Sequence, residues 1–280
     1  MTVHHGHGVN YGRRLVTTPT GRLCAAVLVR PAPAIERAEP LIGEPGAIYA
    51  RACEQHDVLR KTLESFGVET TVIESHSADP YEAAAGDAAV VFEDGAALMR
   101  LTPLSRRAEV DRMQAEFGRM DVPLAGHIAA PALLDGNDIL LAGKTAFVGA
   151  GTRGNQLGRG GFAQLASAHG YRVVEVPLAP GVGSLRSVAG AAASDTIVVA
   201  SGMADPKAFA GFRTVVLELG EGQAAGVLPI DDRHVIAEIR YRTALSSMRR
   251  AGITVEALDL YEFTKLGLTP SMLTIALQRE

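Results

Sequence analysis

The sequence predicts an α/β fold in which one unit recurs around a central axis, rather than an open, doubly wound sheet. The unit is a β-hairpin followed by a helix and a further strand, with three plain copies and two weaker ones. The 280 residues divide into five units of about 56 residues, which is typical of a closed, pseudo-symmetric architecture. A dinucleotide-binding fold would place Gly-x-Gly-x-x-Gly directly after the first strand. Here the glycine-rich stretch at 149–158 follows an internal hairpin, so we set that fold aside.

Hydrophobic periodicity and turn residues define the elements of the first half of the chain. The apolar run at 23–30 predicts a strand, and the stretch rich in Pro and Gly at 32–46 predicts a loop or lid. Apolar residues then follow helical spacing from about Ala47 to Phe66, and Gly67 ends the helix. The next elements are a strand at 69–75, a hairpin at 88–101 that turns at Asp94-Gly95, and a helix at 105–117 with Ser105 as N-cap.

The same alternation continues through the second half of the chain. The predicted elements are a hairpin at 138–150 around Gly143-Lys144, a helix at about 158–169, strands at 171–178, 184–201 and 214–220, a hairpin at 226–238 that turns at Asp231-Asp232, a helix at 241–252 closed by Gly252, and strands at 254–260 and 271–277. We therefore divide the chain into a flexible N-terminal arm at 1–22 and a single domain at 23–280.

Composition excludes several classes of function. The net charge of −4 and the pI near 6.1 give no electrostatic basis for binding nucleic acid or an anionic membrane. No apolar run approaches the roughly 20 residues that span a bilayer, and the N-terminus lacks the apolar core of a signal peptide. Two cysteines, Cys24 and Cys53, fit a reducing compartment rather than a disulfide framework. We expect a cytoplasmic protein with neither nucleic acid nor membrane as a partner.

Three stretches resemble the motifs of one enzyme family. "AAVVFEDGAALMRLTPLSRRAE" (88–109) is similar to the F-V-E-D … R-P … S-R-R-x-E signature of the dimethylarginine dimethylaminohydrolases. "LLDGNDILLAGKTAFVGAGTRGN" (133–155) resembles their E-G-G-D-V … V-G … S-x-R-T-N stretch, and "YEFTKLGLTPSMLTIAL" (261–277) resembles their C-terminal strand. "EQH" (54–56) also fits. The resemblance implies the pentein fold, a five-bladed α/β propeller with pseudo-fivefold repeats, in agreement with the repeat described above.

The resemblance also implies a chemistry. In this family a cysteine thiolate attacks a guanidinium carbon in the central channel, a histidine transfers protons, and carboxylates hold the cation. These tasks require an ionisable nucleophile, a base with a pKa near neutrality and buried acids. No cofactor or metal is implied.

Several acids match the carboxylates of the family. Asp94 and Glu93 correspond to the Glu-Asp that places a guanidinium-binding aspartate, although Asp94-Gly95 also suits a plain hairpin turn. Asp87 matches a further substrate-binding acid with an offset of one residue. Asp135 replaces a glutamate and is shorter by one methylene, and Asp138 matches an aspartate that could equally cap a loop.

Three arginines match family arginines that hold the α-carboxylate of the substrate, a task that suits a bidentate guanidinium. They are Arg106 and Arg107 of the Arg pair and Arg153 of the "S-x-R-T-N" motif. The alternative is that each arginine lies on a solvated face of a helix or loop.

Two positions depart from the family in residues that its chemistry requires. An ungapped match of Glu262 and Lys265 places Met272 at the position of the nucleophilic cysteine, and a thioether has no proton to lose. The family's H-L-K-S appears as "SLRS", which places Ser184 at the position of the histidine, and serine is no base near pH 7. If residues 271–277 form a strand, side chains alternate and Ser271 faces away from Met272; a register shift of one residue would exchange the two.

Other nucleophiles and bases have simpler explanations. Cys24 and Cys53 suit core positions, and His56 is expected to pack on its helix. His127, near the acid loop, suits a core or rim position.

The N-terminal histidines carry no prediction of a metal site. His4, His5 and His7 alternate with glycines and lack partner carboxylates, so we predict a flexible arm rather than a metal site.

Three functions remain open at this level. The first is a catalytically degenerate member of the family that binds a guanidino or amino-acid ligand. The second is an enzyme of altered chemistry that hydrolyses an amidine C–N bond. In it, Asp94 and Asp135 would position a guanidinium or a related cationic substrate. The third is a structural or interaction protein with an occluded channel. The resemblance is also compatible with a homodimer.

Overall fold

Five three-stranded sheets are arranged around one axis. The structure, a computed structural model, describes residues 15–75 and 78–280. The sheets, each given from its inner to its outer strand, are β15 (Thr274–Arg279), β1 (Leu23–Val29) and β2 (Glu69–Ile73); β3 (Ala89–Val91), β4 (Ala96–Leu98) and β5 (Leu124–His127); β6 (Ile139–Ala142), β7 (Thr145–Gly149) and β8 (Arg172–Val176); β9 (Ala189–Ala193), β10 (Thr196–Ala200) and β11 (Arg213–Leu217); and β12 (Leu228–Asp231), β13 (His234–Glu238) and β14 (Thr254–Leu258). The predicted fivefold α/β arrangement is confirmed.

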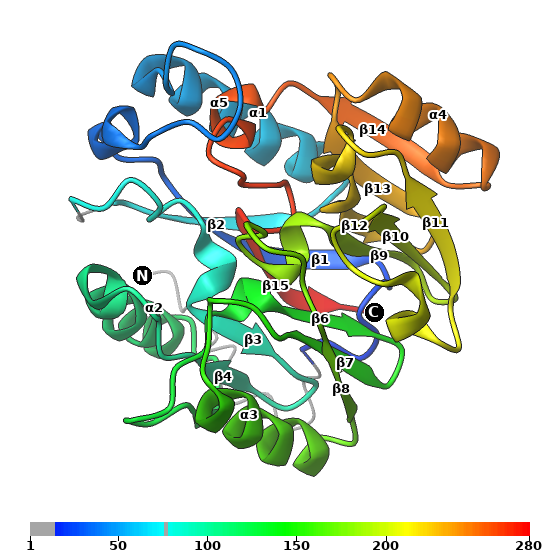
Figure 1. The fold of residues 1–280 in the computed structure, drawn as a ribbon. Coiled ribbons are helices and arrows are strands. Elements are labelled where there is room, and N and C mark those ends of the chain that lie inside the picture. Colours follow the sequence, from blue (N-terminus) through cyan, green and yellow to red (C-terminus); the bar gives the residue numbers. More distant parts are fainter. Residues whose placement is uncertain (1–14, 76–77) are drawn as a thin grey trace.

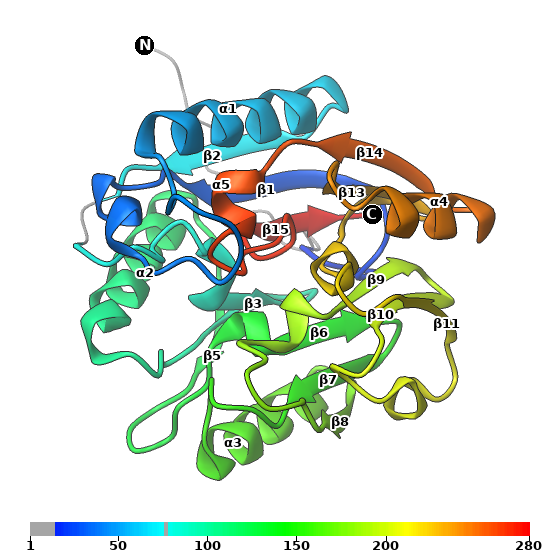
Figure 2. The same ribbon diagram turned by 45° about the horizontal axis from the view of Figure 1, so that its top comes forward.

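Each sheet repeats one pairing pattern. The inner strand is antiparallel to the middle strand, and the middle strand is parallel to the outer strand, as in the sheet formed by β6, β7 and β8. A parallel pair requires a crossover connection. Helices α1 (Tyr49–Ser65), α2 (Arg107–Arg119), α3 (Gln156–Ala168) and α4 (Arg242–Arg250) supply four of these crossovers, and the 3-10 helix η7 (Pro206–Phe209) lies in the fifth. Figure 1 shows the four α-helices on the outside of the sheets, and Figure 2 shows them there from a second direction.

The inner strands are largely apolar and buried at the centre. β9 has the sequence Ala-Gly-Ala-Ala-Ala and β3 has Ala-Val-Val, and all of these residues are buried. Such continuous apolar runs are typical of strands covered on both faces. The outer strands are half-buried or exposed over most of their length, and β8 and β11 become buried only at their last residue.

A ring of short turns closes one end of this barrel-like centre. The 3-10 helices η3 (Ala85–Asp87), η5 (Gly136–Asp138), η6 (Leu185–Ser187) and η8 (Gly222–Ala225) directly precede β3, β6, β9 and β12, and each contacts the next. The turn at 269–272 takes the fifth place before β15, and the Met272 carbonyl accepts a hydrogen bond of 3.0 Å from the Gly86 N–H. This packing needs glycine, because a Cβ on Gly136 would overlap the carbonyl oxygen of Gly86.

The remaining short helices lie outside the ring. They are η2 (Pro33–Arg37) in the predicted loop or lid, η4 (Leu104–Arg106) before α2, and α5 (Tyr261–Thr264) after β14. In the described part of the chain, no helix combines the length and the apolar character needed to cross a bilayer.

The first and last strands of the domain pair with each other. β1 runs antiparallel to β15, so the first sheet takes its inner strand from the C-terminal end of the chain. Leu15 and Val16 are also buried, and Val16 forms a bridge with Arg279. Leu15 and Val16 therefore pack against the domain, although they belong to the predicted arm at 1–22. Residues 1–14 of that arm lie outside the described residues.

Five local predictions are wrong. The stretch at 184–201 is not one strand but η6 followed by the hairpin of β9 and β10. The hairpin of β3 and β4 turns at 93–94, one residue earlier than predicted, because Val91 pairs with Ala96 and Phe92 with Gly95. Arg106, not Ser105, precedes α2, and Ser105 instead donates a 2.8 Å hydrogen bond to Asp79 Oδ2. The last hairpin turns one residue later than predicted, since Asp231 pairs with His234. Ser271 and Met272 precede β15 rather than belonging to it, so strand alternation does not decide where their side chains point.

Two glycines of α3 should respond oppositely to the same substitution. A methyl group on Gly158 would overlap the carbonyl oxygen of Leu133, whereas no atom lies within 4 Å of the corresponding position on Gly160. We expect Gly158→Ala to lower the free energy of unfolding by about 1–3 kcal/mol, and Gly160→Ala to raise it by about 0.5–1 kcal/mol. Urea unfolding of both variants measures the difference. Equal effects would contradict the packing described for the start of α3.

Candidate active site

The ring of turns brings polar residues that are far apart in the sequence to one end of the channel. Asp87 ends η3, Asp135 precedes η5 and Asp138 ends it, Ser184 immediately precedes η6, and Met272 ends the fifth turn. All five residues are buried. Because the turns occupy equivalent places in the repeat, the repeat itself collects these side chains.

Ser184 and Met272 are in direct contact. The Ser184 hydroxyl donates to Met272 Sδ over 3.8 Å, and the two residues are 3% and 4% exposed. A thioether is only a weak acceptor and has no proton to release. Neither side chain exchanges a proton near neutral pH, so this contact provides neither a nucleophile nor a base.

Asp138 is a buried acid with one free oxygen. Its Oδ1 accepts a 2.8 Å hydrogen bond from the Leu185 N–H, while its Oδ2 has no hydrogen-bond partner among the described residues. Burial, aided by the negative charge of Asp135, raises the pKa of Asp138 to about 7. A carboxyl group with such a pKa can hold or release a proton at physiological pH.

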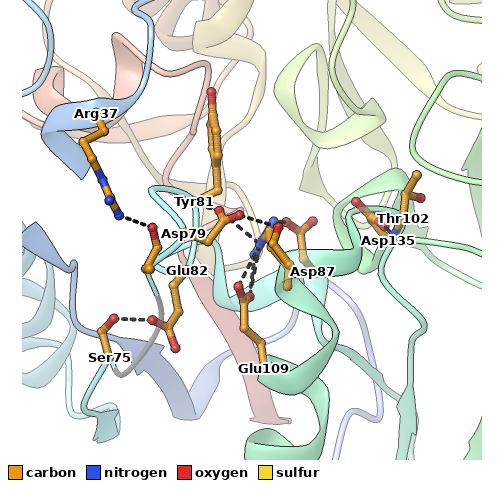
Figure 3. Close-up of polar contacts among 12 residues, drawn as sticks. Arg37, Ser75, Asp79, Tyr81, Glu82, Asp87, Thr102, Glu109 and Asp135 are labelled. Carbon is orange, nitrogen blue, oxygen red and sulfur yellow. Dashed lines mark hydrogen bonds and ion pairs between the residues drawn. The ribbon is translucent and has the colours of Figure 1, made fainter. Parts of the chain in front are cut away.

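Asp135 lies beside a partly exposed arginine. Its Oδ1 accepts a 2.7 Å hydrogen bond from the Thr102 N–H, drawn in Figure 3, and its Oδ2 lies 3.3 Å from Arg153 Nη1. Burial and the charge of Asp87 raise the pKa of Asp135 to about 6, although Thr102 and Arg153 act in the opposite direction. Asp135, Asp138 and Asp87 thus form one electrostatically linked group of acids.

Asp87 is paired with a fully buried arginine. Arg106 Nη1 lies 2.6 Å from Asp87 Oδ2, and Arg106 Nη2 lies 2.7 Å from Glu109 Oε2. Figure 3 shows Asp79, Asp87 and Glu109 converging on this one guanidinium. Burial opposes the charge of Arg106, but these carboxylates outweigh it and raise its pKa. Arg106 is 1% exposed, so its guanidinium acts as an internal counter-ion.

The comparisons with known proteins identify the family. The chain is 31% identical over 236 residues to the N(G),N(G)-dimethylarginine dimethylaminohydrolase of Streptomyces coelicolor, which covers 82% of this chain and 87% of that protein. The chain belongs to the dimethylarginine dimethylaminohydrolase family. The enzyme of the same name from Pseudomonas aeruginosa is 23% identical over 225 residues, or 80% of this chain and 87% of that protein. No family model matches the chain.

Solved structures confirm the pentein fold. The dimethylarginine dimethylaminohydrolase of Pseudomonas aeruginosa, a cysteine-to-serine mutant complexed with citrulline, superposes with a TM-score of 0.83 at 21% identity over 91% of this chain and 99% of that chain. The N-terminal domain of a cyanobacterial arginine dihydrolase bound to substrate has a TM-score of 0.80 at 16% identity, over 91% and 98% of the two chains. The five sheets described above are therefore the blades of a pentein propeller.

Some residues that resemble the dimethylarginine dimethylaminohydrolase motifs lie away from the buried acids. Asp94 is in the turn between β3 and β4 with a side chain that is 69% exposed, and its Oδ1 lies 2.8 Å from His169 Nδ1. Glu93 precedes it and is half-buried. Arg107 donates to the Leu101 carbonyl over 3.2 Å. The structure brings together Asp87, Asp135, Asp138 and Arg153, but not these three residues.

Two residues that the motif comparison did not single out bridge the ring. Arg186 Nη1 donates to Asn137 Oδ1 over 2.9 Å, and Arg186 Nη2 donates to the Ser271 carbonyl. Asn137 Nδ2 lies 3.4 Å from the Met272 carbonyl. The available signals were their positions within "SLRS" and between the two acids of "DGND".

The other candidate residues lie elsewhere. Cys24 and Cys53 are free and partly exposed, and His127 is exposed on β5. His56 is fully buried on α1, as expected, and burial lowers its pKa to about 4.

No metal cluster is evident among the described residues. They contain no group of three or more His, Cys, Asp or Glu that could hold a metal ion, while His4, His5 and His7 lie outside the described residues.

Replacing the buried arginine should destabilise the fold. Arg106→Met leaves Asp87 and Glu109 buried without their cation, and we expect the free energy of unfolding to fall by about 3–5 kcal/mol. Arg107→Met, one residue away on α2, is the matched control and should cost no more than about 1.5 kcal/mol. Denaturant unfolding compares the two. A small loss for Arg106→Met would contradict its role as counter-ion.

Asp138 should make the free energy of unfolding depend on pH. The pKa of Asp138 rises on folding from 3.8 to about 7, so its stabilising contribution is present below pH 4 and is lost as the pH rises through 7. Asp138→Asn does not titrate and should therefore gain stability relative to the wild type between pH 4 and 8. The gain is at most about 4 kcal/mol, since one pKa unit corresponds to about 1.4 kcal/mol.

Thermal unfolding across this pH range measures the Asp138 effect. Glu218→Gln, at an exposed position, is the control and should follow the wild type at every pH. An Asp138→Asn difference that is constant with pH would contradict the raised pKa.

Proposed function

We propose that this chain is a dimethylarginine dimethylaminohydrolase homologue that binds a cationic guanidino or amino-acid ligand without cysteine-dependent hydrolysis. The observation that carries the proposal is the 3.8 Å contact between Ser184 Oγ and Met272 Sδ. The motifs assign these residues to the positions of the base and the nucleophile. A cooperating base and nucleophile must lie within hydrogen-bond reach, and two residues 88 positions apart in the sequence satisfy that requirement here.

The surroundings of Ser271 support Met272 as the residue at the nucleophile position. Ser271 Oγ lies 3.3 Å from Thr269 Oγ1, and its carbonyl accepts from Arg186. A serine nucleophile needs a base beside its hydroxyl, and the hydrogen bonds described for Ser271 Oγ include none to a histidine or carboxylate. The alternative register, with Ser271 as nucleophile, therefore gains no support.

The acids favour a cationic ligand. Burial raises the pKa values of Asp135 and Asp138, as does a neighbouring negative charge, that of Asp87 for Asp135 and that of Asp135 for Asp138. A guanidinium bound beside these acids would offset that charge. Asp138 Oδ2 is free to accept a hydrogen bond. Asp135 Oδ2 lies beside Arg153, which is 26% exposed and can move aside. The citrulline in the Pseudomonas structure and the substrate in the arginine dihydrolase structure support a ligand of this class.

Ligand entry requires local opening, because Asp135 and Asp138 are both 0% exposed. The covering groups include Arg153 above Asp135. We therefore expect slow association compared with an open cleft.

A second function, an enzyme of altered chemistry, is favoured by one observation. Asp138 has a free carboxyl oxygen and a pKa of about 7, which suits a general acid or base. In that case a bound cation would react with water rather than with a side-chain nucleophile. Turnover of a small amidine that Asp138→Asn abolishes would support this second function.

Calorimetric titration tests the binding. We expect arginine, agmatine or a methylated arginine to bind, and Asp138→Asn to weaken that binding by at least about tenfold, or about 1.4 kcal/mol. Asp94→Ala is the matched control: its exposed side chain should leave binding unchanged, whereas the assignment from the motif requires a loss. If the folded wild type bound none of these compounds, the proposed ligand class would be overturned.

Restoring the missing groups tests the catalytic part. The wild type should release no citrulline from dimethylarginine above the uncatalysed rate. We expect the double variant Met272→Cys with Ser184→His to release it measurably, and each single variant to remain inactive, because nucleophile and base act as a unit. Colorimetric citrulline determination provides the readout. Citrulline release by the wild type that Asp138→Asn abolishes would overturn the degenerate assignment.

A further inference from the structure

A cavity lies in the channel on the strand side of the ring of turns. Its volume is about 110 Å³, and its wall consists mainly of apolar side chains of β3, β6, β12 and β15, together with Val16. The polar side chains that line it are Ser271, Thr274 and two arginines, Arg186 and Arg279. Within residues 15–75 and 78–280, no acidic residue lines it. Asp138, Ser184 and Met272 do not line it either, so it is separate from the site proposed above.

Arg279 approaches the cavity from β15. It is 2% exposed, and its Nη1 and Nη2 donate to the carbonyls of Gly21 and Pro229 over 2.8 and 2.7 Å. Both acceptors are neutral backbone oxygens. The hydrogen bonds hold the guanidinium in place but leave its charge uncompensated.

Arg186 approaches the cavity from the ring of turns. Its partners, Asn137 Oδ1 and the Ser271 carbonyl, are also neutral. Among the described residues, neither Arg186 nor Arg279 forms an ion pair with a carboxylate. Asp87 favours the charge of Arg186 through space, but Asp87 is already paired with Arg106. Asp231, which acts in the same way on Arg279, is exposed at the end of β12.

The two cations destabilise each other. Burial lowers the pKa of Arg186 to about 10, and burial together with the charge of Arg186 lowers the pKa of Arg279 to about 9. Both guanidinium groups remain charged at neutral pH. Burying an unpaired charge costs several kcal/mol, so two unpaired like charges on one cavity favour an anionic occupant.

We propose that this cavity is a binding site for a small oxyanion held between Arg186 and Arg279. The guanidinium groups supply the charge and the N–H donors, and the Ser271 and Thr274 hydroxyls are further polar groups on the wall. A volume of about 110 Å³ holds several water molecules or one anion of the size of propionate or phosphate. The apolar wall favours a short aliphatic carboxylate over an inorganic anion.

The anion site is independent of the proposed cation site. The cavity opposes the buried acids in charge and lies beyond the ring of turns, with Arg186 between the two. A test that uses only anions therefore gives a result whether or not a guanidino ligand binds at Asp135 and Asp138.

Titration of the full-length protein with sodium propionate, and separately with sodium phosphate, tests the proposal by calorimetry and thermal unfolding at constant ionic strength. We expect saturable binding of propionate and a rise in Tm that follows its concentration. Arg186→Gln should weaken the binding by at least about tenfold. Arg119→Gln removes a 72% exposed arginine from α2 and is the matched control; it should bind as the wild type does.

The titration of the wild type is decisive even if Arg186→Gln does not fold. Absence of saturable binding of either anion would overturn the site, as would binding that Arg186→Gln and Arg119→Gln leave equally unchanged. Binding of phosphate but not of propionate would keep the site and assign it to inorganic oxyanions. Arg186→Lys keeps the charge without the planar fork and should give intermediate affinity.

Discussion

The close backbone contact between neighbouring turns is the constraint on which the rest of this structure depends. The Gly86 N–H donates to the Met272 carbonyl over 3.0 Å, and the Leu185 N–H donates to Asp138 Oδ1 over 2.8 Å. Contacts this short require small residues such as Gly136. They fix the spacing of the five blades and also bring Asp138, Ser184 and Met272 together. The fold and the site therefore share the same atoms, and a change in one alters the other.

The ring of turns also separates two regions of opposite charge. Asp87, Asp135 and Asp138 lie in or beside the turns, and Arg186 and Arg279 face the channel. The internal cation Arg106 pairs with Asp87 and Glu109, and no described ion pair joins either of these carboxylates to Arg186 or Arg279. Since a low-dielectric interior strengthens interactions between charges, this separation creates a field along the channel axis. Small ions of opposite sign would be drawn to different ends of the same molecule.

Much of the fold was predictable because its signals are local. The turn residues Gly143-Lys144 mark the hairpin of β6 and β7 as predicted. The helices α1 and α4 end two residues before Gly67 and Gly252, both of which have positive φ. The N-cap prediction for Ser105 is wrong although a serine before a helical run suits an N-cap. The Ser105 hydroxyl instead donates its hydrogen bond to Asp79. That partner is 26 residues away, and no local pattern reveals it.

The site was predictable only in part. The motifs located Asp135, Asp138, Ser184 and Met272, and the structure brings these residues together. They could not show that Arg106 is buried between Asp87 and Glu109, because charge pairing inside a fold depends on tertiary packing. They also gave Asp94 a role that its 69% exposed side chain does not suggest. A motif gives the residue type at each position. Whether that side chain is buried, and with which charge it pairs, depends on the three-dimensional structure.

The pairing of β1 with β15 has a consequence for the order of folding. The register joins Leu23 with Arg279, so the sheet that contains β1 receives its inner strand only after Thr274–Arg279 has been made. Until then β1 has an unpaired edge, which is a template for pairing with another chain. Because contacts over so large a sequence separation form slowly, the last step of folding should be the closure of the ring. The propeller would then close only when segments from opposite ends of the domain meet.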